Sequence, residues 1–230
     1  MAALSQHQQS ATLLAFPGAA QTIAGGVIAA ALRHHRVPEL LAAQLLRAAS
    51  GADPQGALTK ALSSRMGVTP LDLNTDRPIL LLGERGVGKS AVAAAIAAMA
   101  RRECLLLTAQ EGLAQHRAGA LPAARLVVME ADGFHPLNPK ARGAFAALSE
   151  MTGVDAIGVV SACGDAEDAA EMVKGFRFRR LIVTGLDRTR RLGALTAAVT
   201  CGAGLAHVLK GGNLENLYPD NLAAALLAPM

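Results

Sequence analysis

The feature that most constrains this chain is a glycine-rich segment at residues 83–90, which reads GERGVGKS. An apolar run, 79–82, precedes the segment and an alanine-rich stretch follows it, so the expected order is strand, loop and helix. In that order the pattern is typical of a loop whose inward-pointing N–H groups, together with the start of the helix, hold phosphate oxygens. We expect Lys89 to contact the β- and γ-phosphates of a nucleotide and Ser90 to bind Mg²⁺. The expected phosphate contacts are Gly83, Glu84, Arg85, Gly86, Val87, Gly88, Lys89 and Ser90. The alternative is a turn that only joins a strand to a helix.

Short apolar runs alternate with stretches of helical periodicity from residue 79 onward. The expected strands are 79–82, 104–108, 125–130, 156–162, 181–184 and 205–209, and the expected helices are 89–101, 139–151, 165–175 and 190–199. Strands that alternate with helices form a parallel sheet covered on both faces. We therefore predict an α/β fold, a parallel sheet of the P-loop NTPase type.

The chain before this sheet has a different character. Residues 1–18 are rich in glutamine and are expected to form a flexible leader, and 19–76 are expected to form a small helical bundle. Pro38 is placed at the start of the second helix and Asp53 at the cap of the third, before a polar connector at 67–78. Residues 77–230 would form the sheet domain, whose last helix, 220–228, is expected to pack back on the bundle.

Composition excludes several classes of protein. Hydrophobic residues make up 52% of the chain and charged residues 17%, which excludes global disorder. Aromatic residues make up only 3%, which disfavours base stacking, so no nucleic-acid partner is expected. The three cysteines are far apart in the sequence, and we find neither a secretory signal nor a run long enough to span a bilayer. We expect a cytoplasmic protein. Its arginines at 177, 179, 180, 188, 190 and 191 either form a solvated face or meet phosphates or acidic lipids, which would hold the protein peripherally on the inner face of the plasma membrane.

A second motif follows the expected strand 181–184. Thr184-Gly185-Leu186-Asp187 is similar to the TKxD motif of GTPases, in which the aspartate accepts hydrogen bonds from two N–H groups of guanine. Gly185 stands where the motif has a lysine that lies over the base. The alternative is that Asp187 only caps the helix that passes through Leu192.

The continuation TGLDRTRRLGALTAA resembles the TKLDETARLGG stretch of the signal-recognition-particle GTPases, with Thr189, Arg191 and Gly193 in matching places. The order of parts is also similar, because a helical bundle precedes the GTPase domain and a Gly-Gly-Asn segment and a helix close it. The resemblance covers about residues 20–228 and is strongest to the flagellar branch of the family, the FlhF-type GTPases. It implies a site for GTP and Mg²⁺ that includes Thr184, Asp187, Arg191 and Gly211. It also implies pairing across the nucleotide face, in a homodimer or with a related GTPase.

The family's DTxR motif is altered. This motif supplies a carboxylate that orients the attacking water and an arginine that steadies phosphate charge. Gln110 and Leu113 stand in those two places. Gln110 could still position a water molecule, as glutamine does in other GTPases, or the segment is a surface loop and helix.

The family's DTAGR motif is altered as well, and reads EADGF at 130–134. Glu130 or Asp132 could hold Mg²⁺ through water, and the backbone N–H of Gly133 could sense the γ-phosphate. The alternative is that Asp132 and Gly133 form only a turn.

The altered motifs remove groups that stabilise charge in the transition state. Nucleotide binding should therefore be retained where hydrolysis is slowed or lost. We expect a divergent GTPase of the signal-recognition type that controls docking in protein targeting or flagellar placement, with slow or partner-dependent hydrolysis. Two alternatives stay open. One is a pseudo-GTPase that serves as an interaction module, and the other is a P-loop ATPase or small-molecule kinase.

Overall fold

The computed structural model describes residues 23–122, 125–131, 138–141, 143–144 and 153–228. Its centre is an eight-stranded sheet in which seven strands lie in the order β1-β7-β6-β5-β2-β4-β3 and pair in parallel. The eighth strand, β8, pairs antiparallel with β7. In chain order the strands are β1 (Gly67–Val68), β2 (Ile79–Leu82), β3 (Cys104–Thr108), β4 (Leu126–Ala131), β5 (Asp155–Ser161), β6 (Arg180–Thr184), β7 (Gly204–Lys210) and β8 (Asn213–Glu215).

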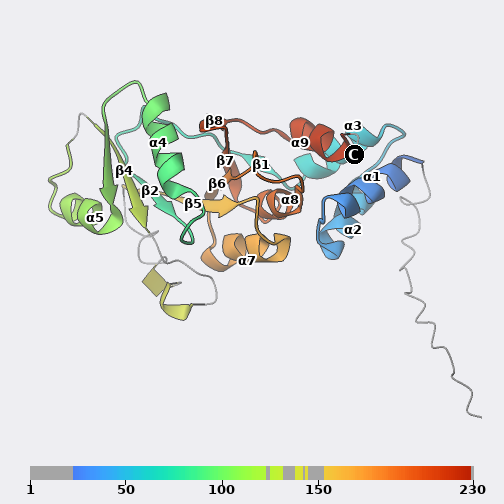
Figure 1. Ribbon diagram of the computed structural model, residues 1–230, viewed down its shortest axis with the longest axis horizontal. Coiled ribbons are helices and arrows are strands. Elements are labelled where there is room, and N and C mark those ends of the chain that lie inside the picture. Colours follow the sequence, from blue (N-terminus) through green and yellow to red (C-terminus); the bar gives the residue numbers. More distant parts are fainter. Residues whose placement is uncertain (1–22, 123–124, 132–137, 142, 145–152, 229–230) are drawn as a thin grey trace, which may run out of the picture.

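Helices cover both faces of the sheet. Helix α4 (Lys89–Met99) lies on one face, while α7 (Ala166–Phe176) and α8 (Gly193–Val199) lie on the other (Figure 1). Helix α5 (Ala109–Arg117) packs against β3 and β4 at one edge. This arrangement explains the unbroken apolar runs of the central strands, because strands covered on both faces bury every side chain.

Alternate residues of β2 enter different hydrophobic clusters. Ile79 and Leu81 pack in the cluster that includes α4, whereas Leu80 and Leu82 pack in the larger cluster that includes α7 and α8. All four side chains are buried. The loop that follows this strand is therefore anchored from both faces of the sheet.

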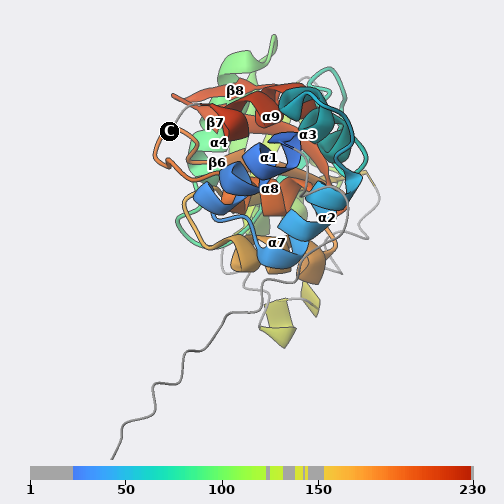
Figure 2. The ribbon, with the colours of Figure 1, turned by 90° about the vertical axis from the view of Figure 1, so that its right-hand side faces the viewer.

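A helical bundle lies at the opposite end of the sheet from β3, on the right of Figure 1. It consists of α1 (Ile23–His34), α2 (Glu39–Ala48) and α3 (Pro54–Ser63), and the last helix, α9 (Pro219–Leu227), packs against α1 and α3. Figure 2 shows the molecule from the side of this bundle. Asp53 caps α3 as expected, since its carboxylate accepts hydrogen bonds from the next two free backbone N–H groups.

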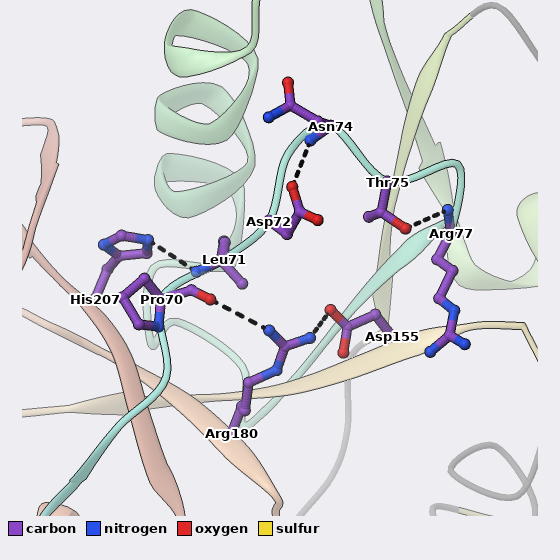
Figure 3. A network of polar contacts seen from close by, with 9 residues as sticks. All are labelled: Pro70, Leu71, Asp72, Asn74, Thr75, Arg77, Asp155, Arg180 and His207. Atoms are coloured by element: carbon purple, nitrogen blue, oxygen red, sulfur yellow. Dashed lines mark hydrogen bonds and ion pairs between the residues drawn. The ribbon is translucent and has the colours of Figure 1, made fainter.

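The segment expected to be a polar connector takes part in the sheet, because β1 pairs with β7. Figure 3 shows how the residues that follow β1 are held. The backbone N–H of Leu71 donates to Nε2 of His207 in β7 over 3.2 Å, and Arg180 donates to the carbonyl of Pro70 over 3.5 Å. Arg180 also forms an ion pair with Asp155. The connector is thus fixed to the neighbouring strands β7 and β6.

The arginines at 177–180 and 188–191 do not form one basic face. The first group lies at the amino end of β6 and the second follows its carboxyl end. Within the described part of the chain, no helix combines the length and the apolar character needed to cross a membrane.

Candidate functional site

The glycine-rich loop leaves the carboxyl end of β2, between the ends of β4 and β5. In open parallel sheets, ligands bind at this edge, where the order of the strands reverses. Gly86 and Gly88 have φ values of 83° and 96°, a left-handed conformation that suits glycine. At Gly83 a Cβ atom would lie 2.4 Å from the carbonyl oxygen of Val159, so only glycine fits against β5. The loop therefore needs glycine at 86 and 88 for their left-handed backbone and at 83 for the close approach to β5.

Lys89 is the first residue of α4 and is only 3% exposed. Its Nζ atom donates to the carbonyl oxygens of Gly83 over 3.2 Å and Glu84 over 2.6 Å. A buried ammonium needs such acceptors, and here the loop itself supplies them. Because the N-terminal end of α4 adds its own positive potential, this site favours an anion.

The hydroxyl of Ser90 and the carboxylate of Glu130 lie together. Ser90 Oγ donates to Glu130 Oε2 over 2.8 Å, which links the start of α4 to β4. A hydroxyl and a carboxylate are oxygen ligands of the kind that Mg²⁺ uses, so the pair fits the predicted metal. No cluster of three or more metal-binding side chains exists among the described residues, so phosphate and water oxygens would have to complete the coordination. The other two predicted residues, Asp132 and Gly133, lie outside the described residues.

Thr184 connects the segment predicted to read the base to the glycine-rich loop. It ends β6, is 5% exposed, and donates from Oγ1 to the carbonyl oxygen of Val87 over 2.5 Å. Its own carbonyl accepts a hydrogen bond from the N–H of Ala162, just beyond β5. The two predicted halves of the nucleotide site are therefore in direct contact.

Asp187 lies in a turn that follows β6. The N–H of Arg188 donates to the carbonyl of Gly185 over 3.1 Å, which places Leu186 and Asp187 at the centre of the turn. Asp187 is exposed, and α8 begins only at Gly193. The alternative reading of Asp187 as the cap of that helix is therefore wrong.

Arg191 and Gly211 were also predicted to contact nucleotide. Arg191 contacts the bundle, since its guanidinium donates to the carbonyl of His34, the last residue of α1, and its contact with nucleotide stays a prediction. The N–H of Leu192 donates to Nδ1 of His35 over 3.3 Å, so Leu192 also contacts the turn that follows α1. Gly211 lies in the hairpin turn between β7 and β8, at the same edge of the sheet as the phosphate loop.

The segment predicted to carry a water-positioning residue is helical. Thr108 caps α5 in a capping box, in which its hydroxyl and backbone N–H donate to Glu111 Oε2 and the N–H of Glu111 donates to the hydroxyl. The hydrogen bond from the hydroxyl, and then that from the backbone, hold the pKa of Glu111 below its ordinary value. Gln110 is exposed in the first turn, and Leu113 is buried. The segment is therefore a capped surface helix, and the water-positioning role of Gln110 stays a prediction.

A cavity of about 440 Å³ beside the phosphate loop could not be predicted from the sequence. Glu84 and Val87 of the loop line it, opposite Asp165 and Asp168 at the start of α7. The carboxylates would repel a polyphosphate, so this cavity is not part of the phosphate site. Asp165 is also the cap of α7 and accepts hydrogen bonds from two backbone N–H groups there.

Comparison with known proteins finds no matching family model and no matching curated protein. Solved structures do match. The crystal structure of FlhF complexed with GTP/Mg²⁺ is 18% identical, with a TM-score of 0.70, over 89% of this chain and 99% of that one. The signal recognition particle receptor FtsY from Elizabethkingia anophelis, in complex with GDP, is 13% identical, with a TM-score of 0.63, over 88% and 84%. The 54 kDa signal recognition particle protein from Aeropyrum pernix K1, in complex with GDP, is 22% identical, with a TM-score of 0.59, over 87% and 62%.

These matches confirm the predicted fold, a P-loop sheet preceded by a helical bundle. They also confirm the resemblance to signal-recognition-type GTPases, including FlhF, at the level of the fold. At such low sequence identity, a shared fold does not by itself assign an activity.

Proposed function

We propose that this chain binds GTP together with Mg²⁺ at the carboxyl edge of its sheet. The observation that carries the proposal is Lys89, a buried ammonium held by loop carbonyls at the N-terminal end of α4. Ser90 and Glu130 lie beside it and would hold the metal, whose charge would offset that of the phosphates. An incoming phosphate would take over the hydrogen bonds of the ammonium.

Guanine is the base that suits the neighbouring turn best. The Asp187 carboxylate can accept only, and guanine offers two adjacent N–H donors on its edge, which adenine does not. The hydrogen bond from Thr184 to Val87 keeps this turn next to the phosphate loop, so one nucleotide could reach both. The matched FlhF structure contains GTP and Mg²⁺, which supports the same assignment here.

Hydrolysis is proposed to be slow or dependent on a partner. The carboxylate and the arginine of the family's second motif are replaced by an exposed Gln110 on a capped helix and by a buried Leu113. Removing one such charge-stabilising group typically costs about a hundredfold or more in rate. Nucleotide binding does not need these groups, so binding is retained while turnover is reduced.

The nucleotide state would then act as a signal for docking. We propose a second copy or a related GTPase as the partner, meeting the nucleotide face, in a targeting or flagellar-placement role that includes peripheral membrane contact. The support for this part is the fold shared with FlhF and FtsY. Light scattering of the protein with GDP and with a non-hydrolysable GTP analogue would detect the pairing.

Calorimetric titration with GTP, GDP and ATP, with and without Mg²⁺, tests the binding proposal. Lys89→Ala should abolish measurable binding of any triphosphate, because the buried ammonium is lost. Lys60→Ala is the matched control, since Lys60 is exposed on α3 in the bundle. Unchanged affinity in Lys89→Ala would place the site elsewhere.

The same samples distinguish the alternatives. A preference for ATP over GTP would support a P-loop ATPase and remove the guanine assignment. Tight GTP binding without phosphate release, alone and with the partner, would support a pseudo-GTPase that serves as an interaction module.

A further inference from the structure

We propose that Cys163 and Gly185 act as a pair that positions the base-reading turn. The Cys163 thiol lies beside this turn, in the space that a lysine side chain at position 185 would need. The inference rests on the proposed binding of guanine nucleotides. It adds Cys163, which lies outside all the predicted site residues, as a positioning residue for base selectivity.

The first observation is the pair of hydrogen bonds on one carbonyl. The Gly185 oxygen accepts from the N–H of Arg188 over 3.1 Å and from Cys163 Sγ over 3.3 Å. The first bond closes the turn that carries Asp187, and the second ties that turn to the loop after β5. Cys163 is itself held, because its N–H donates to Ser161 Oγ over 3.1 Å.

The second observation is the lack of space at Gly185. Its φ is 75°, and a Cβ atom there would lie 2.8 Å from Cys163 Sγ. Real Cβ atoms essentially never make so short a contact, so any side chain at 185 would have to displace the thiol or the turn. A lysine at 185 would therefore have to shift the Cys163 thiol and also hold a strained φ.

The third observation separates base selectivity from phosphate binding. Thr184, not Cys163, contacts the phosphate loop, and it does so through Val87. The Cys163 thiol acts one residue further along, on the carbonyl that closes the turn of Asp187. Loosening the thiol contact should therefore weaken recognition of the base and leave the phosphate contacts in place.

The test compares GDP and ADP by competition against a fluorescent guanine nucleotide. Cys163→Ala should raise the Kd for GDP about two- to fivefold, because the thiol is a weak donor whose loss loosens the turn, and leave that for ADP unchanged. Cys163→Ser, which keeps a donor, should restore most of the GDP affinity. Cys201→Ala is the matched control, because the Cys201 thiol also donates to a carbonyl, that of Ala197 in α8.

Two further readouts address position directly. Cys163 is exposed, whereas Cys104 and Cys201 are partly buried and burial raises the pKa of both thiols, so a maleimide should label Cys163 first. Bound GDP should slow that labelling. Gly185→Ala should cost more GDP affinity in the wild-type background than in Cys163→Ala, because the backbone strain is common to both and the clash occurs in only one.

Several outcomes would overturn the inference. An unchanged ratio of GDP to ADP affinity in Cys163→Ala, with labelling that GDP does not slow, would do so while leaving the proposed function intact. An equal loss of affinity for GDP and for ADP in Cys163→Ala would show that the thiol only supports the fold. If the wild-type protein binds no nucleotide at all, the proposed function fails, and this inference fails with it.

Discussion

At the scale of single residues, Asp187 is the side chain on which the proposed choice of base depends. It is exposed at the centre of a turn closed by the Gly185 carbonyl, and its two oxygens can only accept hydrogen bonds. Asparagine has the same shape, but its amide group donates on one side. It would therefore face one N–H of guanine with another donor.

We predict that Asp187→Asn weakens GTP binding by at least about tenfold, because a hydrogen bond to a charged group is replaced by an unfavourable donor pair. Xanthine carries an oxygen where guanine carries its exocyclic amine, so binding of xanthosine triphosphate should improve in the same variant. Competition titrations with both nucleotides measure the two effects. Asp220→Asn, at an exposed position in the first turn of α9, is the control. GTP affinity that does not change in Asp187→Asn would separate this turn from the base.

The residues of the phosphate loop could be predicted because their signal is local: the spacing of three glycines, a lysine and a serine between a strand and a helix. The position of Cys163 could not, because its partner Gly185 is 22 residues away and a thiol has no characteristic motif. The pattern Thr108-x-x-Glu111 was a readable capping box. Recognising it would have favoured a helix at Gln110 from the outset.

At the scale of elements, the position of α5 limits which catalytic groups the segment in place of the DTxR motif can supply. The helix begins directly after β3, which leaves no loop to carry catalytic groups toward the phosphates. Leu113, at the place of the family's arginine, is 8% exposed and packs in the main hydrophobic cluster.

Restoring the family's residues should therefore not restore catalysis. We predict that Leu113→Arg lowers the free energy of unfolding by about 3 kcal/mol, since it removes a packed side chain and buries a guanidinium. Gln110→Asp, at an exposed position, should change it by less than about 0.5 kcal/mol. Urea denaturation gives both values, and a phosphate-release assay gives the rates. Faster GTP hydrolysis in the double variant, with stability intact, would contradict this account of α5.

The principal strands could be predicted to within one residue, because each is an apolar run with polar or glycine residues at its ends. The short strands β1 and β8 were missed, since they are set by pairing with β7 and carry no apolar run. Helix α8 starts at Gly193, three residues later than expected, because Arg191 and Leu192 contact the bundle. Most of the predicted helix 139–151 lies outside the described residues.

At the scale of the whole molecule, two buried histidines lie where separate segments of the fold meet. We call these two contacts joints: one holds the connector to β7, and the other holds the turn after α1 to Leu192. His207 accepts the hydrogen bond that fixes the connector to β7. His35, in the turn after α1, accepts from Leu192, which follows the base-reading segment. Burial lowers the pKa of both side chains, and at His35 hydrogen bonding to Leu226 partly offsets it. At His35 the neighbouring His34 ring and Arg191 lower the pKa further.

The sign of the pH dependence follows from these shifts. A histidine whose pKa is lower in the folded protein than in the unfolded chain stabilises the fold above the unfolded pKa of about 6.5. That contribution is lost as the pH falls through the folded value. At either joint, protonation would turn the accepting nitrogen into a donor that faces a backbone N–H. We therefore predict that the free energy of unfolding decreases progressively when the pH is lowered from 8 to 5.

Replacing His35 and His207 with glutamine should make the free energy of unfolding depend less on pH, because the amide oxygen of glutamine accepts a hydrogen bond at every pH. Urea denaturation of the wild type, His35→Gln, His207→Gln and the double variant, at several pH values, measures the slopes. His116→Gln, on α5 and away from both joints, should keep the wild-type slope. If the double variant loses stability on acidification as steeply as the wild type does, the acid-sensitive groups lie elsewhere. If only His35→Gln flattens the slope, the joint between the bundle and the base-reading segment is the one that acid opens.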